Sequence, residues 1–352
     1  MVKRYEVACI QCIPKVVKEA SNKWEVINQN LDRIIELIEF TVTRFGKIKL
    51  AVLPEYGIMG TYRPRSVAQW LEVAVPVPGP ATDRLAEVAH RNDCYIAANL
   101  MEADPEWPGR FFNTSFIISP AKEVILKYRK HNGPNNMAVS YTGPGDVFTE
   151  YVNKYGLKGL FPVVDTPIGK LACMTCYDIV FPEVARCLAL NGAEVIIHPT
   201  SEPYMAVDPI WQMQKQTRAY ENLAYLVSTN VGGFLGTHRP EFFSHGQSVV
   251  VGYDGRIIAE TRGPGESVIR GMIDLEALRD DRTQIQANIL NPLYQLRAQM
   301  YGAVYTQAHA FPNDYWAGKP IENPAEATSL GRRILNDLLQ AGLIVPPTNK
   351  ED

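Results

Sequence analysis

The sequence predicts an α/β protein in which two sheets pack face to face with helices on the outside. Strand-like and helix-like patterns alternate along most of the 352 residues. The alternation occurs in two successive halves of similar length. With 46% apolar residues, the chain can bury a large core. Two packed sheets with helices on their outer faces therefore form the expected architecture.

The first half begins with a strand over 4–12 and a long amphipathic helix from Trp24. The apolar residues of this helix recur with the 3.6-residue period of a helix buried on one face. Ser21 or Asn22 is expected to cap its start, and Gly46 to end it. The elements predicted next are a strand over 48–53, a helix over 81–92, strands over 94–100, 113–118 and 123–129, and a loop over 132–146.

The second half repeats this order. A predicted strand ends at Cys176, and Pro182 suits the first turn of the helix that follows. The elements predicted next are a strand over 194–198, a helix over 208–222, and strands over 223–230, 246–252, 256–261 and 267–273. Periodicity weakens after about residue 285. We therefore expect a main domain over 1–284 and an arm over 285–352 that packs on a neighbouring subunit.

The composition argues against several kinds of partner. A net charge of −3 favours neither nucleic acid nor an anionic membrane surface. The longest apolar runs are far shorter than the roughly 20 residues of a membrane span. Met1 leads directly into a strand-like segment, without the pattern of a signal peptide. These features predict a cytoplasmic protein with no nucleic-acid or membrane partner.

The six cysteines are predicted to be thiols rather than disulfides. Two pairs, Cys9/Cys12 and Cys173/Cys176, have the C-x-x-C spacing of zinc ligands. Both pairs lie in strand-like stretches, however, where side chains three residues apart point to opposite faces. A shared metal site is therefore not expected.

Two candidate active-site residues follow predicted strands, where α/β proteins usually build their sites. Glu55 comes just after the strand over 48–53. Partial burial there raises the pKa of a carboxyl group toward that of a useful base, although a solvated loop residue is the alternative reading. Lys130 alternates with Lys127 and Arg129 along a strand. It is therefore expected to point inward, while those two form an exposed basic patch.

Cys176 is the third candidate, at the end of a strand about six residues before a helix. Backbone N–H groups at such a turn lower the pKa of a thiol and can hold an oxyanion. The other five cysteines are interpreted as structural. An alternative cysteine–histidine hydrolase could use one of three histidines, His131, His198 or His245. That alternative leaves Glu55 and Lys130 without a role.

The order of these segments resembles the three signature regions of the nitrilase, or carbon–nitrogen hydrolase, superfamily. The matching segments are Leu53-Pro54-Glu55-Tyr56, Tyr128-Arg129-Lys130-His131 and Cys176-Tyr177-Asp178-Ile179-Val180-Phe181-Pro182-Glu183, with Phe112-Asn113-Thr114-Ser115 among the supporting matches. The resemblance is greatest to the aliphatic amidase and formamidase branch. The glutamate loop of that branch is similar to Pro54-Glu55-Tyr56-Gly57-Ile58-Met59-Gly60.

This resemblance implies a four-layer αββα sandwich over 1–284 and an amidase that acts through a cysteine thioester. It assigns Glu55 as the base, Cys176 as the nucleophile, and Lys130 with the backbone N–H of Tyr177 as the stabilisers of the oxyanion. It also implies a small or medium amide substrate, no metal, no organic cofactor and a dimer-based homo-oligomer, with a hexamer or larger assembly as one form. A nitrilase, an N-carbamoyl hydrolase and a catalytically weakened binding or scaffold homologue are the alternatives.

One feature departs from the family pattern. Members usually carry a second active-site glutamate after the lysine, but an ungapped match falls on Ala138. The candidate substitutes are Asn135, Asn136 and a carboxylate from another loop, such as Glu202. Because the pocket loses a charge and gains room, we expect a larger amide to be a better substrate than acetamide or formamide. The residues predicted to bind the substrate are Tyr56, Tyr62, Asn136, Ala138, Glu202 and Tyr204.

Overall fold

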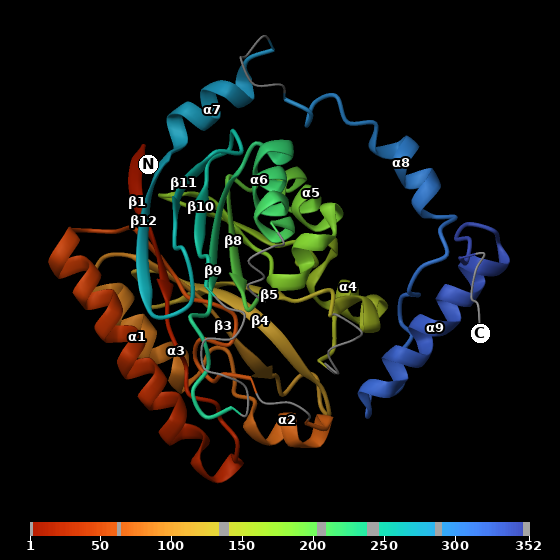
Figure 1. Ribbon diagram of the computed structural model, residues 1–352, viewed down its shortest axis with the longest axis horizontal. Coiled ribbons are helices and arrows are strands. Elements are labelled where there is room, and N and C mark those ends of the chain that lie inside the picture. Colours follow the sequence, from red (N-terminus) through yellow and green to blue (C-terminus); the bar gives the residue numbers. More distant parts are fainter. Residues whose placement is uncertain are drawn as a thin grey trace.

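Two six-stranded sheets form the centre of the molecule. The computed structural model describes residues 3–61, 65–133, 141–202, 209–237, 246–285 and 291–347. Within them, the strand order is β12-β1-β2-β3-β4-β5 in the first sheet and β11-β10-β9-β8-β7-β6 in the second. Helices α1 and α3 cover one side of this pair, and α5 and α6 cover the other (Figure 1). The predicted α/β class with two helix-flanked sheets is confirmed.

The first sheet contains a parallel core. Strands β1, β2 and β3 run parallel, whereas β4, β5 and β12 pair antiparallel with their neighbours. Strand β12 belongs to the end of the main domain and returns to pair with β1, which ties the two halves together. The strands are β1 (Arg4–Gln11), β2 (Leu50–Val52), β3 (Tyr95–Ala103), β4 (Phe111–Ile118), β5 (Val124–Arg129) and β12 (Ser267–Asp274).

The second sheet repeats this plan. Strands β7, β8 and β9 run parallel, and β6, β10 and β11 are antiparallel to their neighbours. The carboxyl ends of β7 and β8 therefore lie side by side. The strands are β6 (Val163–Thr166), β7 (Gly169–Cys173), β8 (Val195–Thr200), β9 (Tyr225–Asn230), β10 (Val249–Val251) and β11 (Ile257–Glu260).

The covering helices bury the faces that their periodicity predicts. In α1 (Lys23–Phe45), residues such as Ile27, Leu31 and Ile38 are fully buried against the first sheet. Gly46 ends this helix with a φ of +95°, a conformation that glycine adopts without strain. Asn22 holds the cap position, but its side chain makes no capping bond. The other covering helices are α3 (Pro80–Arg91), α5 (Pro182–Leu190) and α6 (Ile210–Asn222).

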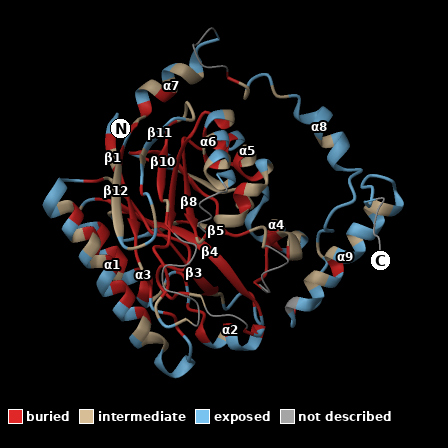
Figure 2. Cartoon of the chain, viewed as in Figure 1, coloured by how far each residue is buried: buried red, intermediate tan, exposed pale blue. Residues whose placement is uncertain are grey.

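The buried residues form layers between these elements. One cluster lies between α1, α3 and the first sheet, and a second fills the space between the two sheets and beneath α5 and α6. Figure 2 shows both sheets as mainly buried and the outer helix faces as exposed. Cys9 belongs to the second cluster and Cys12 to the first. These two thiols therefore lie on opposite faces of the first sheet, as the strand alternation predicts.

Several elements were not expected from the sequence. They are short, so few residues carry their periodic signal. These elements are α2 (Val67–Val73), α4 (Phe148–Tyr155), β6 and α7 (Leu275–Thr283). The arm also contains two helices, α8 (Ala298–Tyr305) and α9 (Pro324–Gln340). None of the helices in the described ranges is long and apolar enough to cross a membrane.

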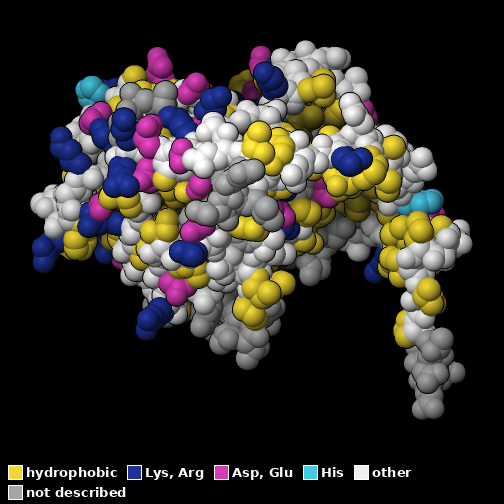
Figure 3. All heavy atoms as spheres, turned by 90° about the horizontal axis from the view of Figure 1, so that it is seen from above, with side chains coloured by type: hydrophobic (Ala, Val, Ile, Leu, Met, Phe, Trp, Pro, Cys, Tyr) yellow, Lys and Arg dark blue, Asp and Glu magenta, His cyan; other side chains and the backbone are white. Residues whose placement is uncertain are grey.

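The arm leaves the main domain after α7 and runs along one side of the molecule (Figure 1). It touches its own domain at a few points. Arg110 donates from Nη2 to the carbonyl oxygens of Trp316 and Ala317, and Asp314 accepts hydrogen bonds from Thr149 at the start of α4. Many of its apolar side chains are nevertheless exposed, and Figure 3 shows hydrophobic side chains on its surface.

Candidate active site

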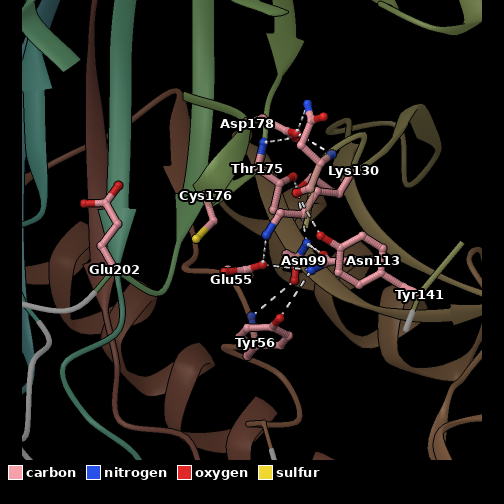
Figure 4. Close-up of polar contacts among 12 residues, drawn as sticks. Glu55, Tyr56, Asn99, Asn113, Lys130, Tyr141, Thr175, Cys176, Asp178 and Glu202 are labelled. Atoms are coloured by element: carbon pink, nitrogen blue, oxygen red, sulfur yellow. Dashed lines mark hydrogen bonds and ion pairs between the residues drawn. The ribbon is translucent and has the colours of Figure 1, made fainter. Parts of the chain in front are cut away.

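Glu55 lies in a turn that begins three residues after β2. Its side chain is 1% exposed. One carboxylate oxygen, Oε1, accepts hydrogen bonds from Lys130 Nζ at 2.8 Å and Asn113 Nδ2 at 2.7 Å. The Cys176 thiol also hydrogen-bonds this carboxylate. The solvated reading of Glu55 is therefore wrong, and the structure brings the three candidate residues together (Figure 4).

Lys130 follows β5 directly, and strand alternation sets its direction. Lys130 and Tyr128 point toward the second sheet, where Tyr128 donates a hydrogen bond to Asp178. Lys127 and Arg129 point the other way and both pair with Glu102. The predicted alternation is confirmed, but the prediction of an exposed patch is wrong for Arg129. Its side chain is 2% exposed and is buried in this ion pair.

Cys176 opens a short 3₁₀ turn, Cys176–Val180, and does not end the strand as expected. Strand β7 ends three residues earlier, at Cys173. The backbone of Cys176 has a φ of +48°, a left-handed conformation that is strained for a residue with a side chain. His198 Nε2 lies 3.0 Å from the carbonyl oxygen of Cys176 and supports this conformation.

Asp178 links the turn of Cys176 to the segment that carries Lys130. Its Oδ2 accepts hydrogen bonds from the Tyr128 hydroxyl at 2.7 Å and from the Thr175 backbone at 3.2 Å. Its Oδ1 accepts one from the Asn132 backbone at 2.9 Å. Tyr128 and Asn132 flank Lys130 by two residues on each side. This single buried carboxylate therefore aligns the lysine with the cysteine across the two sheets.

The charges of the three residues depend on one another. Burial opposes ionisation of Glu55, but the Lys130 ammonium and the hydrogen bonds outweigh it and lower the pKa of this carboxyl. Burial also opposes the charge of Lys130, yet the Cys176 and Glu55 charges hold its pKa well above the usual value. Burial and the Glu55 charge raise the pKa of the Cys176 thiol to about 12.

The resting site therefore contains a carboxylate, an ammonium and a neutral thiol. The backbone N–H of Ser201 does lower the pKa of the thiol, as expected for a backbone donor, but burial and the adjacent carboxylate outweigh it, so the pKa is raised. Such a thiol becomes a nucleophile only if a base removes its proton during attack. Glu55, which is ionised and hydrogen-bonded to the thiol, is placed to do this.

A chain of buried polar side chains supports the Glu55 carboxylate. The sequence analysis includes two of them, Asn113 and Ser115, in a family match but assigns them no role. Asn113 Oδ1 accepts from Asn99 Nδ2 at 2.6 Å, and Asn99 Nδ2 also lies 3.2 Å from Ser115 Oγ. Ser115 Oγ is 2.8 Å from Thr175 Oγ1, and Thr175 directly precedes Cys176. All four residues are fully buried. The presence of Asn113 and Ser115 within the otherwise apolar strand Phe111–Ile118 could have indicated this network, since buried polar groups need hydrogen-bond partners.

The described histidines do not form a cysteine–histidine pair. Both ring nitrogens of His198 are engaged, by the Cys176 carbonyl oxygen and by Ser228 Oγ at 2.9 Å. His131 stacks on Phe161 and its Nε2 lies 2.7 Å from the Leu160 carbonyl oxygen. Burial lowers the pKa of both imidazoles. The third candidate, His245, lies outside the described residues.

The predicted substrate-binding residues divide into two groups. Tyr62, Asn136, Ala138 and Tyr204 lie outside the described residues. Tyr56 and Glu202 lie beside the three reactive side chains (Figure 4). Tyr56 is buried, and its hydroxyl accepts a hydrogen bond of 3.5 Å from Asn113 Nδ2. Glu202 follows β8 and forms an ion pair with Lys215.

The part of the chain that the structure describes holds no cluster of three or more His, Cys, Asp and Glu residues able to bind a metal ion. In the arrangement described above, a neutral thiol and a fixed cation both hydrogen-bond one buried carboxylate. A base and a thiol can attack an electrophilic carbon, and a cation can stabilise the negative charge that then develops on oxygen. These groups are the ones that an acyl-transfer reaction through a thiol requires.

The comparisons with known proteins agree with this chemistry. The family model for carbon–nitrogen hydrolases matches residues 6–283. Formamidases from Bacillus thuringiensis (strain Al Hakam) and Bacillus anthracis are 32% identical over 299 residues, which cover 83% of this chain and 82% of theirs.

Solved structures share the fold. Saccharomyces cerevisiae Nit3, a member of branch 10 of the nitrilase superfamily, superposes with a TM-score of 0.64 at 24% identity, over 82% of this chain and 96% of that one. An amidase from Nesterenkonia sp. gives 0.61 at 20% identity, over 86% and 98%. A carbon–nitrogen hydrolase from Helicobacter pylori gives 0.65 at 19% identity, also over 86% and 98%.

Proposed function

Because this chain belongs to the carbon–nitrogen hydrolase family of the nitrilase superfamily and is an amidase-like enzyme for non-peptide amide bonds, we propose that Cys176 carries the reaction. The substrate is a small or medium amide, and the products are a carboxylic acid and ammonia. One observation carries the proposal. The Glu55 carboxylate hydrogen-bonds the Cys176 thiol and the Lys130 ammonium at the same time, in a buried site.

In the first step, the Cys176 sulfur attacks the amide carbonyl carbon while Glu55 takes the thiol proton. The carbonyl oxygen becomes an oxyanion, which Lys130 and the backbone N–H of Tyr177 stabilise. Because the thiol is neutral at rest, proton transfer and attack are coupled. Removing the positive charge of Lys130 would therefore leave the one negative charge, on Glu55 at rest and on the oxyanion after proton transfer, unbalanced in a buried space.

In the second step, the C–N bond breaks as Glu55 returns its proton to the leaving nitrogen. Ammonia departs, and the acyl group remains on Cys176 as a thioester. A water molecule then gives a proton to Glu55 and attacks the thioester carbonyl. The C–S bond breaks, the sulfur recovers the proton, and the acid leaves. The cycle is balanced without any oxidant or cofactor.

We propose further that the protein is cytoplasmic and forms a homo-oligomer. All six cysteines are free thiols, which supports a reducing, cytoplasmic location. The exposed apolar residues of the arm support a homo-oligomer. Formamide is a first candidate substrate, because the curated relatives are named formamidases. It competes with the larger amides that a site without the usual second glutamate near Ala138 would favour.

The test is ammonia release from formamide, acetamide, butyramide, benzamide, an N-carbamoyl amino acid and butyronitrile. Cys176→Ala should lower activity at least 10⁴-fold, because the nucleophile is absent. In the natural enzyme, rapid acid quenching and mass spectrometry should find the substrate acyl group on the peptide that contains Cys176. Cys187→Ala is the matched control, since this other partly exposed cysteine lies on α5. It should keep full activity.

Full activity of Cys176→Ala would refute the mechanism. Hydrolysis of the nitrile without hydrolysis of any amide would replace the proposed reaction with that of a nitrilase. No release from any compound, by a folded natural enzyme, would favour the binding homologue.

A further inference from the structure

Glu202 stands next to the nucleophile because β7 and β8 are parallel neighbours. Cys176 lies three residues after β7, and Glu202 lies two residues after β8. The backbone N–H of Ser201, one residue earlier, hydrogen-bonds the Cys176 sulfur. Asn230 holds the Glu202 backbone from the next strand: its Oδ1 accepts from the Glu202 N–H at 3.0 Å, and its Nδ2 donates to the Glu202 carbonyl at 3.1 Å.

The carboxylate of Glu202 is buried, and only one of its two oxygens has a hydrogen-bond partner among the described residues. Its Oε2 forms an ion pair of 2.6 Å with Lys215 Nζ, from α6, and the two side chains are 3% and 1% exposed. Its Oε1 has no hydrogen-bond partner among the described residues. His198 Nδ1 lies 3.9 Å from Oε1, too far for a hydrogen bond, and is engaged by Ser228.

A purely structural role does not account for this oxygen. An ion pair that only joined α6 to the end of β8 would be expected to satisfy both oxygens, since an unpaired buried acceptor destabilises the fold. The backbone of Glu202 is already fixed by Asn230, so the side chain is not needed to hold the loop. A buried acceptor without a donor, beside a nucleophile, is a feature that a bound donor would complete.

The position of Glu202 matches the shape of an amide. In Figure 4, Glu202 lies on one side of Cys176 and Lys130 lies on the other, with the Glu55 carboxylate next to the sulfur. An amide bears its oxygen and its nitrogen on opposite sides of the carbonyl carbon that the sulfur attacks. With the oxygen directed at the donor Lys130, the nitrogen and its N–H groups are directed at the acceptor on the opposite side.

We propose that Glu202 is a specificity-determining residue whose Oε1 accepts a hydrogen bond from the nitrogen of the scissile amide. This inference rests on the proposed function. It defines the substrate class as amides with at least one N–H on the leaving nitrogen, and it disfavours esters. As the C–N bond breaks, Glu55 protonates the nitrogen, which becomes more positive and binds the carboxylate more strongly. The ion pair with Lys215 orients this carboxylate.

The sharpest variant is Glu202→Gln, which keeps the size and reverses the hydrogen-bonding group. Lys215 can only donate, so the glutamine oxygen must turn toward it. The glutamine NH₂ group then faces the substrate nitrogen, where donor meets donor. A second variant, Glu202→Leu with Lys215→Met, removes both charges and leaves no unpaired buried ion. If Glu202→Gln folds poorly, the double variant still tests whether the Glu202 carboxylate binds the amide nitrogen.

The readout is kcat/KM for two substrates with the same acyl group, butyramide and p-nitrophenyl butyrate. Both form the same thioester, but only the amide has an N–H. Glu202→Gln should lower kcat/KM for butyramide about 10- to 100-fold and for the ester less than about threefold. The double variant should show the same selective loss. Glu194→Gln is the matched control, because Glu194 is a buried glutamate paired with Arg279 at the opposite end of β8. Its amide-to-ester ratio should not change.

An equal loss for amide and ester would overturn the inference and assign Glu202 a structural role. No loss for either would also overturn it. A loss confined to amides with a hydroxyl or amino group on the acyl part, such as lactamide against propionamide, would show that Oε1 binds that group instead. Absence of amide hydrolysis by the natural enzyme would refute the proposed function itself, which is a separate outcome.

Discussion

At the scale of single residues, the site depends on how one carboxylate oxygen is shared. Glu55 Oε1 accepts from both Lys130 and Asn113. These donors keep the carboxylate ionised in a fully buried place, where an isolated carboxyl would take up a proton. Its folded pKa therefore lies below the ordinary 4.5. The base is present above that depressed value and is lost as the pH falls through it, so the acid limb of kcat/KM should lie below pH 4.5.

Asn113→Ala tests this balance. The change removes a hydrogen bond that favours the charged form of Glu55, so the pKa of the carboxyl should rise. The acid limb of kcat/KM should move to higher pH by about one unit or more, since a hydrogen bond to a charge is worth about 1.5–3 kcal/mol. The measurement is the pH profile of butyramide hydrolysis.

The control for this prediction is Thr114→Val. Thr114 is the next residue on β4, but its hydroxyl donates to Glu102 on the other face of the sheet. Its pH profile should match that of the natural enzyme. An unmoved acid limb in Asn113→Ala would mean that Lys130 alone sets the pKa of Glu55.

At the scale of the element, β5 serves two purposes on its two faces. Its inward face directs Tyr128 and Lys130 to the site. On its outward face, Arg129 lies 3.0 Å from Glu102, also pairs with Asp104, and lies over the ring of Phe112 at 3.9 Å. This outward cluster anchors the strand whose next residue is the active-site lysine.

Arg129→Met should lower the free energy of unfolding by about 3 kcal/mol, because it removes the buried cation that pairs with Glu102 and leaves the partly exposed Lys127 as the cation beside this carboxylate. Lys127→Met is the matched control. The Lys127 side chain is 34% exposed, so solvent screens its pairing and the loss should be about 1 kcal/mol or less. Urea unfolding measures both. Equal losses would show that the strand does not depend on the Arg129 pair.

At the scale of the whole molecule, the arm is the least self-contained part. Trp316 packs partly against the core of its own chain. Several apolar side chains of the arm are exposed: Tyr294, Met300, Tyr301, Val304, Tyr305, Phe311, Tyr315, Leu343 and Val345. Exposed apolar residues gathered on one segment favour a contact with another chain. The packing of 285–352 on a neighbouring subunit stays a prediction.

Val304→Asp tests it without removing the contacts that the arm makes with its own chain. Val304 is 71% exposed on α8. If it packs in an interface, the buried charge should shift the protein to smaller assemblies in light scattering, and truncation after residue 284 should do the same. Leu157→Asp is the matched control, since Leu157 is 67% exposed on the main domain. A monomeric natural protein would contradict the prediction.

Much of the fold could be predicted because it depends on local periodicity. The helix from Trp24, the positions of the longer strands and the inward direction of Lys130 follow from the alternation and spacing of residues along the chain. Short elements such as α2 and α4 could not be predicted, because seven or eight residues carry too little periodic signal. The sequence predicts that this strand ends at Cys176, three residues beyond the observed end of β7 at Cys173. The residues after Cys173 are held outside the sheet by the contacts of Asp178 with distant segments.

The sequence by itself determined the class of fold, and it identified Glu55, Lys130 and Cys176 as candidate site residues because each follows a strand and stands in a recognisable segment. Only the tertiary structure decided their ionisation and their partners. Burial and the Glu55 charge make the thiol neutral, and Arg129 is buried in its ion pairs with Glu102 and Asp104. The pairing with Lys215 leaves one oxygen of Glu202 without a hydrogen-bond partner among the described residues. These properties depend on desolvation and on contacts between residues far apart in the chain, which no local pattern records.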